Sequence, residues 1–118
     1  ASSIYMGAII AYDNNCKESL LSVSKETLAA YGAVSEETAK EMVMGVQKVF
    51  TTPYAIATTG IAGPDGGTDK KPIGTVCFGF YLDGEIVSVT KLFRGDRERI
   101  RNFSSLFAIN FLRMHIKY

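Results

Sequence analysis

The stretch "TTGIAGPDGGTDKKPIGTV", Thr58 to Val76, holds five glycines, two prolines and two lysines. Glycine permits positive φ angles and lets a ligand approach backbone N–H groups, so the stretch can form an anion-binding concavity. Neither GxxxxGK[ST] nor GxGxxG occurs, which excludes two common nucleotide-binding motifs. From the residues alone, two interpretations stay open: a long connection between strands, or a binding loop.

Strand patterns surround this loop. "YAIATTGIAG" (Tyr54 to Gly63) predicts a buried strand that runs into it, and Thr75 to Leu82 with Glu85 to Phe93 predict a hairpin around "LDGE". Nearer the start, "IYMGAIIAY" (Ile4 to Tyr12) is a continuous apolar run that also predicts a buried strand.

Helix-start signals divide the remainder of the chain. We predict a short helix from Asp13 or Asn14 to about Leu21, and others capped by Ser24, Ser35 and Asp96. The last of these runs from Arg97 to about His115 and is apolar on more than one face. Such a helix is expected to be buried beyond one sheet face, so we predict a homo-oligomer, with a dimer favoured.

The order of these elements predicts an α/β fold, as one domain over residues 1–118. We expect a three-layer α/β/α sandwich with a mixed, mostly parallel sheet. A buried central strand needs neighbours on both sides, yet the first strand pattern begins almost at the first residue. We therefore expect that the domain lacks its first strand and helix in this chain.

Composition limits the partners. Thirteen Lys and Arg against twelve Asp and Glu give a net charge of +1, so we expect no nucleic-acid partner and no membrane partner, and any phosphate recognition must be local. No membrane-span or signal-peptide pattern occurs, and Cys16 and Cys77 form no disulfide framework, which favours a cytoplasmic protein. Cys77 is expected to pack in the core. His115 is the single histidine and is expected at the surface, and we predict no metal and no cofactor.

"ATTGIAGPDGGTDKKPIGTVCF" closely resembles the signature of the CinA C-terminal domain family, also found as stand-alone nicotinamide-nucleotide amidases. "YGAVSEETAKEM" and "FRGDRERIR" agree with the family too, so the resemblance covers essentially the whole chain. One departure accompanies it: the E-S-x-T-G-G segment with which members usually begin is absent, which matches the expected missing strand.

The resemblance implies an α/β/α fold and an amidase that hydrolyses the carboxamide of nicotinamide mononucleotide to the acid and ammonia, in pyridine nucleotide salvage. It assigns the chemistry to a serine, a tyrosine ten residues on and a lysine five residues later. Ser2, Tyr12 and Lys17 have that spacing here. Ten extended residues span about 33 Å, so Ser2 meets Tyr12 only if the opening segment folds back.

The implied chemistry is coherent. A serine that attacks an amide must lose its proton, and without an available histidine a neutral lysine is the base to expect. Lys17 would serve if its pKa fell, which a helix N-terminus and partial burial favour. Tyr12 would relay the proton or hold the lysine, and backbone N–H groups would stabilise the oxyanion.

Substrate binding is expected from four loop residues and one arginine: Thr59, Gly60, Ala62, Gly63 and Arg97. Arg97 opens the last helix, where a phosphate would meet both the guanidinium and the helix N-terminus.

Ordinary roles compete with each of these assignments. Ser2 beside a terminus is more often a frayed residue, Tyr12 a packing residue and Lys17 a solvated charge. Arg97 also suits a surface pair with Glu98 or Asp96, and Lys70 with Lys71 suits loop solvation better than phosphate capture.

Three functions use residues of these types. The amidase is the first, and a non-catalytic nucleotide-binding or assembly module is the alternative. A short-chain dehydrogenase also uses Ser, Tyr and Lys, but its Tyr and Lys are separated by three residues rather than four, and no Rossmann fingerprint is present.

Overall fold

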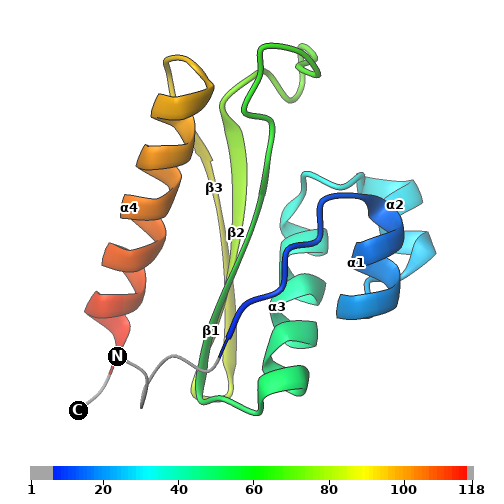
Figure 1. The fold of residues 1–118 in the computed structure, drawn as a ribbon, viewed down its shortest axis with the longest axis vertical. Helices are drawn as coiled ribbons and strands as arrows, with labels where there is room; N and C mark the ends of the chain where they lie inside the picture. Colours follow the sequence, from blue (N-terminus) through cyan, green and yellow to red (C-terminus); the bar gives the residue numbers. More distant parts are fainter. Residues whose placement is uncertain (1–6, 117–118) are drawn as a thin grey trace.

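The computed structural model describes residues 7–116 and contains four helices and three strands. In chain order these are α1 (Asn14–Leu21), α2 (Lys25–Tyr31), α3 (Glu36–Phe50), β1 (Tyr54–Gly60), β2 (Thr75–Leu82), β3 (Glu85–Leu92) and α4 (Arg97–His115). Figure 1 shows α4 on one side of the strands and the other helices on the opposite side.

The α/β class is confirmed, but the expected mostly parallel sheet is wrong. The three strands lie in the order β1-β2-β3, and both pairings are antiparallel. The physical reason is the connections: residues 61–74 link β1 to β2 without a helix, and the Asp83-Gly84 turn links β2 to β3. Parallel neighbours need a crossover, usually a helix, which neither link supplies.

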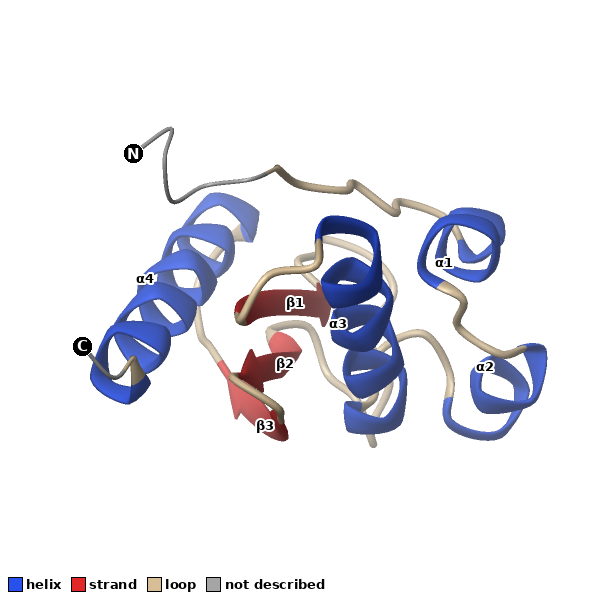
Figure 2. Ribbon diagram, turned by 90° about the horizontal axis from the view of Figure 1, so that it is seen from below, coloured by secondary structure: helices blue, strands red, loops and turns tan. Residues whose placement is uncertain are grey.

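Helices cover both faces of this sheet. Helix α3 packs against β1 and β2, with α1 and α2 outside it, while α4 packs against the other face (Figure 2). The core accordingly has two parts. One joins α1 and α3 to the sheet through residues such as Leu21, Val43 and Ala57. The other joins α4 to the sheet through Phe78, Phe80 and Ile100 among others, so β2 is buried on both faces.

The strand predicted from Ile4 to Tyr12 is wrong over its described part. Residues 7–12 form neither strand nor helix, and the side chain of Ile10 is 86% exposed. Within residues 7–116 no strand pairs with this segment, because β1 pairs with β2 along its inner edge and with no other described strand. An apolar run becomes a strand only where another strand satisfies its backbone groups. Ile4 to Met6 lie outside the described residues.

The predicted helix starts are confirmed. Asp13, Ser24, Ser35 and Asp96 are the N-caps of the four helices, and each side chain accepts a hydrogen bond from the backbone N–H three residues later. This bond satisfies one of the N–H groups that a helix leaves without a partner at its start. The last helix therefore begins at Arg97, as the sequence predicts.

Backbone meets backbone on both sides of α3. A Cβ atom added at Gly79 of β2 would lie 2.3 Å from the Ala39 carbonyl oxygen, and one added at Gly45 would lie 2.1 Å from that of Leu21. Neither glycine has a positive φ, so space rather than conformation requires it. Two glycines thus set the distance of α3 from the sheet and the distance of α1 from α3.

Glu36, at the start of α3, connects this helix to the edge strand β3. Its carboxylate accepts hydrogen bonds from the Ser88 hydroxyl at 2.7 Å and the Thr90 hydroxyl at 2.5 Å. These two bonds, Thr90 first, lower the pKa of the Glu36 carboxyl below its ordinary value. The charged form of Glu36 therefore stabilises the fold.

Two smaller expectations are also confirmed. Cys77 is 3% exposed and packs in the core, where burial raises the pKa of its thiol, and His115 is exposed. On α4, Leu106, Ile109 and Met114 are exposed, while the homo-oligomer that would cover such side chains stays a prediction. Over residues 7–116, none of the helices has the length and apolar character needed to cross a bilayer.

We expect Gly79→Ala to lower the free energy of unfolding by about 1–3 kcal/mol, because the new methyl group would collide with the Ala39 carbonyl and move α3 off the sheet. Thermal or urea denaturation measures the loss. A melting temperature equal to that of the unmodified chain would show that this contact is not tight.

Stability should also depend on the ionisation of Glu36. Because the pKa of the Glu36 carboxyl is lowered in the folded state, the carboxylate contributes its full stabilisation above the unfolded-state pKa of about 4.3. This stabilisation is lost as the pH falls through the folded-state pKa. Urea denaturation at pH 7 and pH 3 should therefore differ less for Glu36→Gln than for the unmodified chain. An identical difference for both proteins would contradict the assignment.

Candidate functional site

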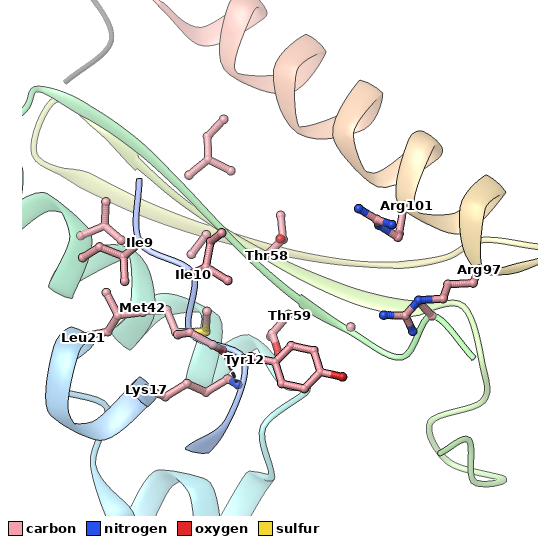
Figure 3. Close-up of a pocket in the computed structure, with 16 residues that line it drawn as sticks. Ile9, Ile10, Tyr12, Lys17, Leu21, Met42, Thr58, Thr59, Arg97 and Arg101 are labelled. Atoms are coloured by element: carbon pink, nitrogen blue, oxygen red, sulfur yellow. Dashed lines mark hydrogen bonds between the residues drawn. The ribbon is translucent and has the colours of Figure 1, made fainter. Parts of the chain in front are cut away.

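A cavity of about 810 Å³ follows the edge of β1 that faces away from β2. It opens between residues 9–12, the buried faces of α1 and α3, and the start of α4, as Figure 3 shows. Its lining residues are Ile9, Ile10, Ala11, Tyr12, Lys17, Leu21, Met42, Val46, Ile56, Ala57, Thr58, Thr59, Gly60, Ala62, Arg97 and Arg101. In Figure 3 the apolar Ile9, Leu21 and Met42 gather on the Lys17 side, Arg97 and Arg101 lie on the α4 side, and Thr58 and Thr59 lie between them.

Lys17 lies at one end of this cavity. The side chain is 6% exposed, and its Nζ atom donates a hydrogen bond to the Ala11 carbonyl oxygen at 3.1 Å. Over residues 7–116 that is the one hydrogen bond of this amine. Isolated buried cations are costly and therefore uncommon. Lys17 is thus not the solvated surface charge that a lysine on a short helix usually is.

Tyr12 borders the same end. Its side chain is 87% exposed and extends over the mouth of the cavity in Figure 3. The Lys17 amine binds the carbonyl of the residue before it, so the backbone of Tyr12 and the amine are held together. The structure therefore brings Tyr12 and Lys17 to one wall, whereas Ser2 lies outside the described residues.

The end of β1 forms the floor beside Lys17. Thr59 is 9% exposed, and its hydroxyl donates a hydrogen bond to the Ala33 carbonyl oxygen at 2.8 Å. This bond ties the end of the strand to the turn between α2 and α3. Gly60 follows in the lining, and a Cβ atom there would lie 2.9 Å from a methyl carbon of Val76. A side chain is therefore excluded at Gly60, which leaves the backbone open to the cavity.

Arg97 lies at the other end, where α4 begins. Its Nη1 atom donates a hydrogen bond to the Gly63 carbonyl oxygen at 3.0 Å. Ala62 lines the cavity, but Gly63 does not, and Gly63 reaches the site only through this contact with Arg97. The alternative of a surface pair between Arg97 and an acidic neighbour is not what the structure shows.

A second cavity of about 290 Å³ adjoins the first on the α4 side of β1. The two share Thr58, Gly60, Ala62, Arg97 and Arg101, and the second adds Val76, Ile100, Ser104 and Ser105. Sequence reasoning missed Thr58 and Arg101. The sequence does contain one indication of Arg101, because a residue four positions after Arg97 lies on the same face of a helix.

Lys70 and Lys71 lie elsewhere. They line a third cavity with Glu36 and Glu37, and the Lys71 amine donates to the Tyr31 carbonyl oxygen at 2.6 Å. Lys71 thus holds the glycine loop (residues 61–74) against α2, and both lysines lie away from the cavities along β1. Phosphate capture by this lysine pair at the candidate site is therefore excluded by its position.

The arrangement suits a polar, anionic substrate better than a metal. A buried amine and a phenol border one end, and two guanidinium groups border the other. Among residues 7–116, no three side chains of the His, Cys, Asp or Glu type gather closely enough to hold a metal ion. The chemistry that these side chains allow is proton transfer at the first end and charge recognition at the second.

Comparison with known proteins gives one consistent result. The family model of the CinA C-terminal domain matches residues 1–116. The CinA-like protein of Fervidobacterium nodosum is 47% identical over 115 residues, which are 98% of this chain and 28% of that protein. The CinA-like protein of Kosmotoga olearia is 47% identical over 112 residues, or 95% of this chain and 27% of that protein.

Solved structures agree. A competence-damaged protein (CinA) superfamily protein from Escherichia coli superposes with a TM-score of 0.83 and 36% identity, over 86% of this chain and 59% of that one. The competence/damage inducible protein CihA from Agrobacterium tumefaciens gives 0.82 and 34%, over 87% of this chain and 64% of that one. The chain thus spans less than a third of its curated relatives and about three fifths of these structures.

Replacing the buried amine should stabilise the fold. We expect Lys17→Met to raise the free energy of unfolding by about 1 kcal/mol, because methionine keeps the length of the side chain and removes the cost of burying an amine that has one hydrogen-bond acceptor. Thermal denaturation at pH 7 measures the change, and Lys48→Met on the exposed side of α3 is the control. A lower melting temperature for Lys17→Met would mean that the amine is held by more than its bond to Ala11.

Proposed function

The chain belongs to the CinA C-terminal domain family, and from that premise we propose that it hydrolyses the carboxamide of nicotinamide mononucleotide to nicotinic acid mononucleotide and ammonia. The observation that carries the proposal is the burial of the Lys17 amine beside Tyr12, at the end of a cavity whose other end is cationic. A structural role does not require an amine at this buried position, whereas amide hydrolysis requires a base there.

In the proposed reaction Ser2 is the nucleophile. Its Oγ atom forms a bond to the carboxamide carbon, and the Ser2 proton passes to the neutral Lys17 amine, directly or through the Tyr12 phenol. Ser2 lies outside the described residues, so its role rests on the family resemblance. The hydrogen bond from Lys17 to the Ala11 carbonyl supports the role of the lysine, because it fixes the amine next to Tyr12.

The tetrahedral intermediate carries a negative charge on the former carbonyl oxygen. Backbone N–H groups near Thr59 and Gly60 are proposed to stabilise it, since among residues 7–116 no strand pairs with the outer edge of β1 and Gly60 carries no side chain. Collapse of this intermediate breaks the carbon–nitrogen bond, and the Lys17 ammonium gives its proton to the leaving –NH2 group, which departs as ammonia. Water then hydrolyses the ester on Ser2, with Lys17 acting again as the base.

Ammonia release from nicotinamide mononucleotide tests the proposal. The assay compares the 118-residue chain with a form extended at its N-terminus by the corresponding segment of the F. nodosum relative. We expect the extended form to be active, and Lys17→Ala in it to lower kcat by about 10³-fold, within the range of general-base catalysis. Tyr12→Phe should cause a smaller loss of kcat.

Two further variants make the test specific. Lys17→Arg keeps the positive charge but cannot act as a base, so it should be as inactive as Lys17→Ala. Lys25→Ala, on the exposed surface of α2, should keep full activity. Equal background release from the extended form and from all variants would reject the amidase and leave the non-catalytic binding module.

A further inference from the structure

Two arginines face the cavities from α4, and their surroundings differ. Arg97 and Arg101 are one helical turn apart, and both line the cavity beside β1 and the second cavity beside α4. Figure 3 shows both side chains reaching from α4 toward β1. Sequence reasoning assigned phosphate binding to Arg97 because it opens the helix, but position in a helix does not show which guanidinium is free to bind a ligand.

Arg97 is engaged with the protein. Its Nη1 atom donates to the carbonyl oxygen of Gly63, where the chain has a φ of +82°. A Cβ atom at Gly63 would lie 2.8 Å from a methyl carbon of Ile73, so the glycine loop is tightly folded at this point. This hydrogen bond from Arg97 thus fixes the first part of the loop, at the residue that directly follows Ala62 in the cavity wall.

Arg101 has no such engagement. Within residues 7–116 its guanidinium makes no hydrogen bond and no ion pair. The Asp96 carboxylate, at the N-cap of α4, accepts a hydrogen bond from the backbone N–H of Arg99. A guanidinium carries five N–H donors and a permanent charge, and none of them is used by a protein acceptor here.

Hydroxyl groups lie beside Arg101 in the second cavity. The Ser104 hydroxyl donates to the Ile100 carbonyl oxygen at 2.7 Å, whereas the exposed Ser105 hydroxyl has no partner within the described chain. The remainder of the lining is small or apolar, through Ala62, Val76 and Ile100. A free guanidinium and a free hydroxyl therefore lie in a small cavity that contains no carboxylate.

We infer that this second cavity binds the phosphate group of the substrate, that Arg101 is its charged contact, and that Arg97 is a positioning residue that holds the glycine loop. The inference rests on the proposed function for the identity of the substrate. A phosphate monoester carries a double negative charge and three acceptor oxygens, which a guanidinium binds in a bidentate manner and a serine hydroxyl completes.

The two ends of the cavity then bind different parts of the substrate. The carboxamide reacts beside Lys17, and the phosphate binds beside Arg101, with the sugar along β1 next to Thr58 and Gly60, which line both cavities. The enzyme is therefore expected to prefer a nucleotide over the nucleoside or the free base. That preference resides in Arg101, because Arg97 acts on every substrate alike through the loop.

The test compares Arg101→Gln, Arg97→Gln and Arg113→Gln, with the last as a charge-matched control in the final turn of α4. Inorganic phosphate and nicotinamide mononucleotide are titrated into each protein by calorimetry or NMR. Arg101→Gln should weaken the binding of both by about 10-fold or more, the value of one charged hydrogen-bond pair. Arg113→Gln should bind both as the unmodified chain does.

Steady-state kinetics on the N-terminally extended form supply the second readout. Arg101→Gln should raise KM for nicotinamide mononucleotide by about 10-fold or more and leave KM for nicotinamide riboside unchanged. Arg97→Gln should lower kcat for both substrates by a similar factor, because it loosens the loop rather than removing a phosphate contact.

Phosphate binding unchanged in Arg101→Gln, or an equal rise of KM for riboside and mononucleotide, would overturn the inference. A loss of phosphate affinity specific to Arg97→Gln would also overturn it. The amidase can fail separately: phosphate affinity that depends on Arg101 in a protein that releases no ammonia would reject the proposed reaction and support the anion subsite.

Discussion

Helix α3 makes direct backbone contact with its neighbours on two sides, and the geometry of the site depends on that constraint. Gly79 lets β2 approach the Ala39 carbonyl, and Gly45 lets α1 approach α3 through the Leu21 carbonyl. Interiors are packed without spare volume, so a displacement of α3 is transmitted rather than absorbed. Lys17 lies one turn before Leu21 on α1, so the depth of its amine in the cavity is fixed by two contacts that do not involve it.

The same packing explains why the candidate site lies at the edge of the sheet. Helix α3 covers one face and α4 the other, so both faces of β2 are sealed by core residues such as Phe78. The outer edge of β1 is left open to a cavity, because residues 7–12 pass beside it without pairing. An unpaired strand edge presents free backbone donors, and an amide carbonyl that becomes an oxyanion requires such donors.

The glycine loop serves this site less directly than its composition indicates. Of residues 61–74 only Ala62 joins the wall of the cavities that border β1, and the loop is held at both sides by cations that donate to carbonyl oxygens. Arg97 holds Gly63, and Lys71 holds Tyr31 across the loop. Long side chains that bind backbone carbonyls keep a flexible segment in one conformation, so this loop acts mainly as a frame for the end of β1.

The sequence by itself determined the local features and the family. The caps Asp13, Ser24, Ser35 and Asp96 were predictable because each bond spans three residues, and the Asp83-Gly84 turn because its conformation is set within the hairpin. Only the tertiary structure decided the antiparallel sheet, the unpaired segment at residues 7–12, the burial of Lys17 and the free guanidinium of Arg101. Each of these features depends on whether residues distant in the sequence supply a hydrogen-bond partner to a strand edge or to a charged side chain. No pattern of neighbouring residues contains that information.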